Sequence, residues 1–314
     1  MTHGAHAHPE DQRNQSVLVD VNGDLVPKAQ AVVSVLDSGF ILGDGIWEGL
    51  RLERGRLAFL DRHLNRLYDA ARSVDMDIGL TPDELRERLV RVLSANGMYD
   101  GVHLRLMVTR GVKATPYQDP RATITAPTIV ILPEFKDPED ALYERGLRLF
   151  TVHVRRGRPD VQDPRLNTHS KHNCIQACIQ AAKAGADEGL MLDPHGFVAT
   201  CNSTHFFIVR HGEVWTSSGD YCLDGITRGV VLDIARDAGI VVHEKNFSLS
   251  EVYAASEVFV TGTFAGLVSV GDVDGRAFQG PFPGPMVSRL QGLYRERVEA
   301  EPLLDGLDPP SDAR

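Results

Sequence analysis

The sequence lacks both a long apolar run and an excess of basic residues. No stretch approaches the roughly 20 apolar residues of a membrane-spanning helix, and the chain does not open on a leader-like pattern. Its 33 Lys and Arg stand against 43 Asp and Glu, which gives a formal net charge of -10. Nucleic acids and anionic membranes bind basic surfaces. We therefore expect neither a nucleic-acid partner nor a membrane partner.

Cysteine is also scarce, and its spacing excludes the common metal sites. The chain has four cysteines, and none of them forms a Cys-x-x-Cys pair. Zinc sites built from such pairs are therefore not expected, and we predict no metal site. Scattered reduced thiols are typical of the cytoplasm, which is the predicted location. The four are Cys174, Cys178, Cys201 and Cys222.

What the sequence does contain is the composition and patterning of a large α and β protein. Hydrophobic residues make up 42% and charged residues 24% of the 314 residues, which is enough for two domains. Asn22-Gly23 between two apolar runs predicts a β-hairpin. Thr81-Pro82 predicts the start of a helix that ends near Asn96-Gly97.

These patterns divide the chain into a small α+β domain and a larger α/β domain. A polar, Pro-containing segment is the best candidate for a linker between them, and both chain ends are polar and expected to be loose. The predicted ranges are a disordered tail at 1–15, the small domain at 16–133, the linker at 134–145, the large domain at 146–300 and a loose tail at 301–314.

Two turns in the predicted large domain have the composition of phosphate-binding sites. Residues 223–228 read Leu-Asp-Gly-Ile-Thr-Arg and open an amphipathic helix. Helix N-termini bind phosphate through unpaired N–H groups and the helix dipole. Thr227 adds a hydroxyl donor, and Arg228 offers a positive charge. A second turn follows at Thr261-Gly262-Thr263, where a predicted strand breaks.

One lysine stands at the start of a predicted helix and is a candidate nucleophile. Lys171 lies between a Pro-containing loop and the apolar helix over 174–184. A lysine that is partly buried loses its proton more easily and can form a Schiff base with an aldehyde. One such lysine and a site for a single phosphate are what pyridoxal phosphate requires of a protein.

The order of these motifs resembles the class IV, fold-type IV pyridoxal-phosphate aminotransferases. This family includes branched-chain and D-amino acid aminotransferases, (R)-selective amine transaminases and aminodeoxychorismate lyase. The resemblance covers roughly Val17 to Leu293, and five motifs follow in the family's order. They are Phe40 to Arg51, His63-Leu-Asn-Arg66-Leu, Lys171, Gly225-Ile-Thr-Arg228 and Thr261-Gly-Thr263.

The resemblance implies a two-domain fold like that of D-amino acid aminotransferase, and roles for individual residues. Lys171 is implied to hold the cofactor aldehyde and to move protons as a general acid and base. Arg66 is implied to neutralise the cofactor phosphate. The other residues implied to bind the cofactor are Thr200, Gly225, Ile226, Thr227, Thr261, Gly262 and Thr263.

The chain departs from the family at three points. The family has an acidic partner for the pyridine nitrogen where this chain has Thr200, or Cys201 if the register slips. A neutral partner makes the ring a weaker electron sink. His205 stands where the family commonly has Asn. The interval from Lys171 to Glu188 is also about one helical turn shorter than the family's.

The substrate pocket is predicted from two strands and one turn. His103 and Arg105 alternate on a strand and so share one face. Arg105 resembles the arginine that branched-chain enzymes place near the substrate carboxylate, with an exposed strand arginine as the alternative. Phe40 and Trp47 are predicted to line the pocket or to pack in the core.

We therefore predict a cytoplasmic, homodimeric aminotransferase that acts on an amine donor and a 2-oxo acid acceptor. The donor is an amino acid or a primary amine, and a branched-chain pocket is slightly favoured over an (R)-amine pocket. Two alternatives stay open. One is a pyridoxal-phosphate lyase of the same fold, similar to aminodeoxychorismate lyase. The other is a protein that binds the cofactor without turnover.

Overall fold

The computed structural model describes residues 4–6 and 8–309, which divide into two compact units. We name each unit by its β-sheet. The six-stranded unit contains Glu10–Asp137, Asn167–Ser170 and the described residues from Val298 onward. The nine-stranded unit contains the described residues before Glu10, together with Pro138–Leu166 and Lys171–Arg297.

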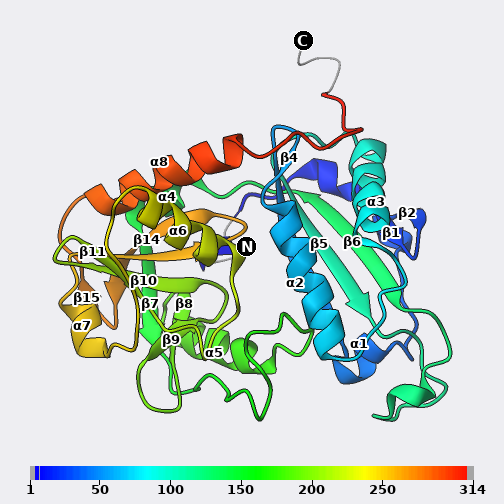
Figure 1. Ribbon diagram of the computed structural model, residues 1–314, viewed down its shortest axis with the longest axis horizontal. Coiled ribbons are helices and arrows are strands. Elements are labelled where there is room, and N and C mark those ends of the chain that lie inside the picture. The colour runs from blue at the N-terminus through cyan, green and yellow to red at the C-terminus, as the bar shows by residue number, and fades with distance from the viewer. Residues whose placement is uncertain (1–3, 7, 310–314) are drawn as a thin grey trace. The chain divides into compact units, whose positions relative to one another are not determined.

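The six-stranded unit is an antiparallel sheet with helices on one face (Figure 1). Its strand order is β2-β1-β6-β5-β3-β4. The strands are β1 Leu18–Val21, β2 Asp24–Pro27, β3 Gly45–Glu53, β4 Arg56–Leu57, β5 Val102–Thr109 and β6 Thr128–Phe135. The helices are α1 Ser38–Leu42, α2 Leu60–Ser73 and α3 Pro82–Ala95.

Local sequence explains both the hairpin and the start of α3. Asn22 and Gly23 have positive φ angles of 54° and 98°, as the tight turn between β1 and β2 requires. Thr81 and Glu84 form the reciprocal capping box in front of α3, with Pro82 at its first position. Both predictions are confirmed.

Strand alternation gives the six-stranded sheet two different faces. Leu50, Leu104 and Ile131 are fully buried on the face that α2 covers. The opposite face carries polar side chains, because Gly49 pairs with Arg105 and Arg51 pairs with His103. This second face therefore displays the residues that were predicted to bind substrate.

The nine-stranded unit mixes parallel and antiparallel pairs in the order β12-β11-β10-β13-β14-β7-β8-β9, with β15 paired to β14. Its strands are β7 Leu147–Thr151, β8 Glu188–Leu192, β9 Val198–Cys201, β10 His205–Arg210, β11 Glu213–Thr216, β12 Val242–Glu244, β13 Glu257–Gly262, β14 Gly266–Val273 and β15 Arg276–Ala277. Its helices are α4 Asp140–Arg145, α5 His172–Lys183, α6 Ile226–Asp237, α7 Leu249–Tyr253 and α8 Pro285–Glu299.

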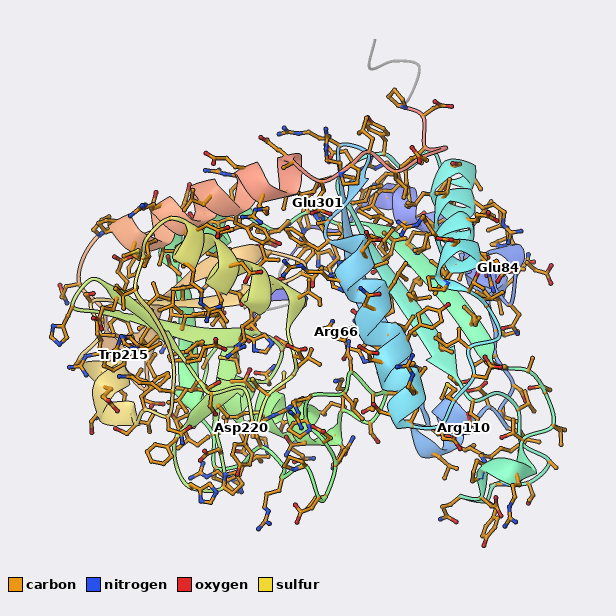
Figure 2. The ribbon with its side chains drawn as sticks, in the orientation of Figure 1. Arg66, Glu84, Arg110, Trp215, Asp220 and Glu301 are labelled. Atoms are coloured by element: carbon orange, nitrogen blue, oxygen red, sulfur yellow. The ribbon has the colours of Figure 1, made fainter. Side chains whose placement is uncertain are left out.

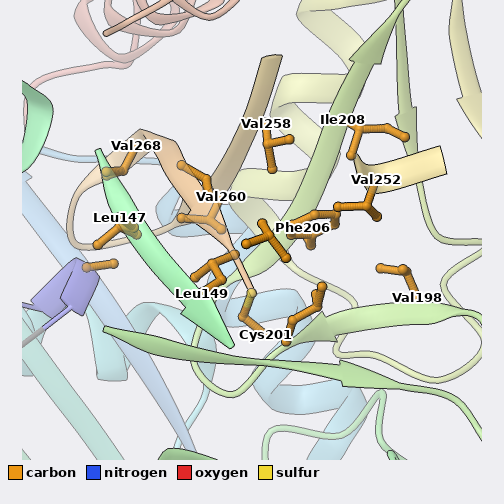
Figure 3. Close-up of a cluster of buried hydrophobic side chains, with 14 of the residues drawn as sticks. Leu147, Leu149, Val198, Cys201, Phe206, Ile208, Val252, Val258, Val260 and Val268 are labelled. Carbon is orange, nitrogen blue, oxygen red and sulfur yellow. The ribbon is translucent and has the colours of Figure 1, made fainter. Parts of the chain in front are cut away.

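A large apolar cluster fills the centre of this second unit (Figure 3). Side chains from β7, β9, β10, β13 and β14 meet there, and Phe206 and Val260 are almost completely buried. Burying each such side chain contributes about 1.5–3 kcal/mol. The cluster therefore fixes the strand ends from which the candidate cofactor turns emerge.

The chain ends and the linker differ from the sequence-based expectation. The expected linker at 134–145 contains the end of β6 and all of α4. In the expected N-terminal tail, Ala5 is buried in the apolar cluster, and Asn14 Nδ2 donates to the Phe135 carbonyl at 2.8 Å. At the other end, the Leu304 amide donates to Gly55 O at 2.8 Å. Residues 1–3, 7 and 310–314 of the expected tails lie outside the described residues.

Candidate active site

The first predicted phosphate turn lies at the start of α6. Gly225 is the N-cap residue, and among the described residues no side chain caps the helix there. The first N–H groups of α6 are therefore available to an anion. Thr227 lies in this first turn and is 4% exposed.

A glycine is required at position 225 because the ring of His205 lies against it. A Cβ at Gly225 would collide with the imidazole. His205 itself is on β10, where it pairs with Thr261 of β13. His205 thus connects the two predicted phosphate turns, which are far apart in the sequence and come together within one unit.

The second predicted phosphate turn begins with a buried hydroxyl that has no hydrogen-bond partner in the described part of the chain. Thr261 is fully buried, and its Oγ1 has no hydrogen-bond partner among the described residues. An unsatisfied buried hydroxyl costs about 1–3 kcal/mol unless a ligand or water pairs with it. Gly262 and Thr263 follow at the end of the strand. This turn therefore has the donor chemistry that a phosphate group needs.

Arg228 does not supply the free charge that the sequence suggested. Its Nη2 donates to Ser217 O and to Glu244 Oε2, both at 2.8 Å. The side chain is 8% exposed, and the salt bridge holds it within its own unit. Arg228 therefore stabilises the start of α6.

The two candidates for the position facing the pyridine nitrogen have different environments. Cys201 belongs to the apolar cluster, and burial raises the pKa of its thiol. Thr200 lies beside it on β9, is 5% exposed, and donates its hydroxyl proton to Thr204 O at 2.8 Å. Because the proton is already used, Thr200 can only accept a further hydrogen bond.

A buried carboxyl group that was not predicted from the sequence lies next to the loop between β9 and β10. Glu188, on β8, is 2% exposed, and burial raises its pKa, although several hydrogen bonds oppose that shift. Its Oε2 accepts from Thr204 Oγ1 at 2.8 Å and its Oε1 from the Ala5 amide at 3.3 Å. Glu188 therefore supports the loop between β9 and β10. An acidic residue at the start of an apolar strand was the available signal.

Arg66 lies on α2 in the six-stranded unit (Figure 2), and a buried carboxylate holds its side chain. Its Nε and Nη2 donate to the two oxygens of Glu48 at 2.8 and 2.6 Å. His63 lies 2.6 Å from the same carboxylate. Burial alone would raise the pKa of Glu48, but Arg66 and His63 together lower it. This bidentate contact fixes the plane of the guanidinium.

Lys171 occupies the N-cap position of α5, where it is half-buried. The preceding segment, Asn167–Ser170, belongs to the six-stranded unit. It is attached there through the edge of β3, since the Trp47 amide donates to Asn167 O at 3.0 Å and the His169 amide to Gly45 O at 2.8 Å. The attachment determines where the chain enters α5.

Asn167 is a second residue that the sequence reasoning missed. It is 3% exposed, its Nδ2 donates to the Trp47 carbonyl at 2.7 Å, and its Oδ1 has no partner among the described residues. It lies four residues before Lys171, which is about one helical turn. The interval from Lys171 to Glu188 is also shorter than the family's by about one helical turn, so the family's spacing would place the lysine at position 167. This spacing was the signal in the sequence that could have identified Asn167.

The predicted substrate residues are only partly brought together. The Arg105 guanidinium lies 3.8 Å from the centre of the Trp47 ring, and His103 is on the same face of β5. Burial lowers the pKa of Arg105, and Glu134 offsets part of the change. No hydrogen bond joins the Arg105 guanidinium to the described residues. Phe40, by contrast, is 72% exposed on α1.

Comparisons with known proteins identify the family. Residues 45–273 match the family described as amino-transferase class IV, and the chain belongs to it. It is 38% identical over 277 residues to a putative branched-chain-amino-acid aminotransferase of Methanocaldococcus jannaschii, covering 88% of this chain and 94% of that protein. The expected family is confirmed.

A solved structure and a plant protein are similar over most of the chain. The T.th. branched-chain amino acid aminotransferase complexed with N-(5'-phosphopyridoxyl)-L-glutamate is 31% identical, with a TM-score of 0.83 over 93% of this chain and 97% of that one. This likeness confirms the expected fold-type IV architecture. The branched-chain-amino-acid aminotransferase-like protein 2 of Arabidopsis thaliana is 37% identical over 288 residues, or 91% of this chain. This chain spans about half the length of that plant protein, since the match covers 51% of it.

The residues present fit the phosphate end of pyridoxal phosphate. His205 lies against Gly225 at the uncapped start of α6 and pairs with Thr261, whose hydroxyl is unsatisfied. The two turns together offer hydrogen-bond donors to an anion. Residues 4–6 and 8–309 contain no cluster of three His, Cys, Asp or Glu side chains able to bind a metal ion. The same residues form no helix long and apolar enough to span a membrane.

Proposed function

We propose that this protein is a pyridoxal-phosphate-dependent aminotransferase. It transfers an amino group from an amino acid or primary amine to a 2-oxo acid, with a slight preference for branched-chain donors. The observation that carries the proposal is the pair of anion-suited turns joined by His205 in one unit. Membership in the class IV family supports the same chemistry.

The cofactor, when bound, supplies an aldehyde for the amine and a ring that withdraws electrons from the amino carbon. Our assignment gives the protein's residues three tasks. The start of α6 with Thr227, Thr261 and Thr263 binds the phosphate, and Arg66 neutralises it. Lys171 provides the attaching amine and then carries the proton to and from the amino carbon.

For the substrate, we assign the carboxylate to Arg105. A half-buried guanidinium without a hydrogen bond to the described residues favours an anionic ligand, because Glu134 offsets only part of the cost of its burial. Trp47 stacks on it and restricts its position. His103 lines the same face, while the exposure of Phe40 gives that residue no structural support as a pocket wall. A cytoplasmic location stays a prediction.

The function is tested by adding an amine donor alone to the protein loaded with cofactor. An aminotransferase converts the absorbance band of the aldehyde form into that of the pyridoxamine form, and a 2-oxo acid restores it. We expect leucine and valine to give faster conversion than D-alanine or an (R)-amine. A lyase instead releases pyruvate without accumulating the pyridoxamine form. No change with any donor would refute the proposal.

A second candidate, cofactor binding without turnover, is favoured by one pair of observations. Asn167 is buried at the position that the family's spacing would give to a lysine, and the neutral Thr200 stands where an acidic residue is expected. The donor test separates the candidates, because a protein of this second type is coloured with the cofactor but does not respond to donors.

Replacing Thr200 with glutamate tests the partner of the pyridine nitrogen. A carboxylate there would keep the ring nitrogen protonated and strengthen its electron withdrawal. We expect Thr200→Glu to raise the transamination rate about tenfold, whereas Thr200→Gln, of similar size and neutral, should not. If both variants fold, bind the cofactor and react at equal rates, Thr200 does not face the ring.

We also propose that the protein is a homodimer. Helix α5 exposes Ile175 by 53% and Ile179 by 42%, and Cys178 lies between them on the same face. Adjacent exposed apolar residues on one helix face favour burial in an interface. Ile179→Glu is expected to shift sedimentation from dimer to monomer, and Glu87→Lys on the exposed face of α3 is not. A wild-type protein of monomeric mass at micromolar concentration would contradict this assignment.

A further inference from the structure

The nine-stranded unit contains a cavity that shares no residue with the candidate active site. Its volume is about 270 Å³, close to the lower end of small-molecule sites. It lies between the first residues of β13, the middle of β14, the loop at 278–284 and the first turn of α8. All four segments belong to one unit, so the cavity is complete without the other unit.

A buried hydroxyl without a partner lines this cavity. Ser269, on β14, is 3% exposed, and its Oγ has no hydrogen-bond partner among the described residues. Native proteins pair nearly all such groups with protein, water or ligand. Ser269 is therefore one of the polar residues in the cavity wall.

A carboxylate stands beside it at the start of α8. Glu257 accepts the Met286 amide at 3.0 Å and the Val287 amide at 2.9 Å, one on each oxygen. Gly284 makes this possible, because a Cβ there would collide with the carboxyl group. Each oxygen keeps a further acceptor site. No Lys, Arg or His of the described residues forms a salt bridge with Glu257.

Most of the remaining wall is apolar, with Ser256 and Gln279 as its other polar residues, and it limits which molecules fit. Since the Glu257 carboxylate is an acceptor, a positively charged head group with an N–H donor is favoured, and a carboxylate is repelled. The walls favour a short hydrocarbon chain. The apolar lining side chains are Val258, Val270, Phe278, Phe282 and Val287.

We propose that this cavity is a binding site for a small alkylammonium ion. The ammonium group donates to Glu257, and the alkyl chain packs against Phe282 and Val287. The site is independent of the proposed transamination, because none of its residues has a role there.

The test is calorimetric titration of the cofactor-loaded protein with dimethylisopentylamine. This tertiary amine keeps one N–H donor and cannot condense with an aldehyde. We expect saturable binding with a dissociation constant on the order of 1 mM. Isopentyl alcohol, which lacks the charge, should bind at least about tenfold more weakly, and isovalerate should not bind. Equal binding of isovalerate, or no binding of the amine at tens of millimolar, would overturn the proposal.

Two variants locate the binding. Ser269→Val replaces the hydroxyl with two methyl groups that narrow the cavity, and it should weaken amine binding at least about tenfold. Glu257→Gln keeps an acceptor for α8 but removes the charge, and it should weaken amine binding about tenfold while leaving alcohol binding unchanged. Ser288→Ala, on the exposed face of α8, is the matched control. Wild-type affinity in folded Ser269→Val would show that the amine binds elsewhere and would contradict the assignment.

Discussion

Lys171→Ala is expected to lower the transamination rate at least about a thousandfold and to remove the absorbance of the covalently attached cofactor. We propose that the amine at this position both attaches the cofactor and carries the proton, so its loss would remove two functions at once. Absorbance spectra and single-turnover rates with leucine measure the two effects separately.

Lys183→Ala is the matched control for this experiment. Lys183 is the last residue of α5 and is exposed, so its replacement should change neither the spectrum nor the rate. If a folded Lys171→Ala protein keeps the absorbance of the covalently attached cofactor, the cofactor is attached to another lysine. If the spectrum and rate both stay at the wild-type level, the proposed role of Lys171 is wrong.

Arg66→Ala is expected to weaken the affinity for pyridoxal phosphate about 10- to 100-fold. In the proposed role, the guanidinium contributes a charge-assisted hydrogen bond to the phosphate, and such a bond is worth about 1.5–3 kcal/mol. Arg66→Lys keeps the charge but loses the two-pronged contact with Glu48 and should be intermediate. Titration of the cofactor-free protein, followed by absorbance, measures the affinity.

The substrate constants of the same variants check the role assigned to Arg66. At saturating cofactor, KM for the donor should change by less than about threefold, because Arg66 is assigned to the phosphate. Arg72→Ala is the control on the same helix, since its side chain is 84% exposed. A large change in KM with unchanged cofactor affinity would reassign Arg66 to the substrate.

Much of the fold could be predicted because its signals are local. The Asn22-Gly23 turn and the capping box at Thr81 depend on residues close in sequence. The two phosphate-suited turns were also visible as motifs. What joins them, the pairing of His205 with Thr261 and the contact of His205 with Gly225, arises from sheet topology, which a linear pattern does not contain.

The roles that could not be predicted depend on partners distant in the chain. Arg228 looked like a free cation because Glu244, which binds it, lies 16 residues away. The ordered start of the chain depends on contacts such as Ala5 with Glu188, 183 residues apart. Asn167 looked like an ordinary loop residue, and only its burial against Trp47 marks it as part of the site region.

The central claim is tested most directly by reducing the cofactor-loaded protein with borohydride and mapping the modified peptide by mass spectrometry. The account predicts that the phosphopyridoxyl group is attached to Lys171. Cofactor that binds stoichiometrically but leaves Lys171 unmodified after reduction would contradict it.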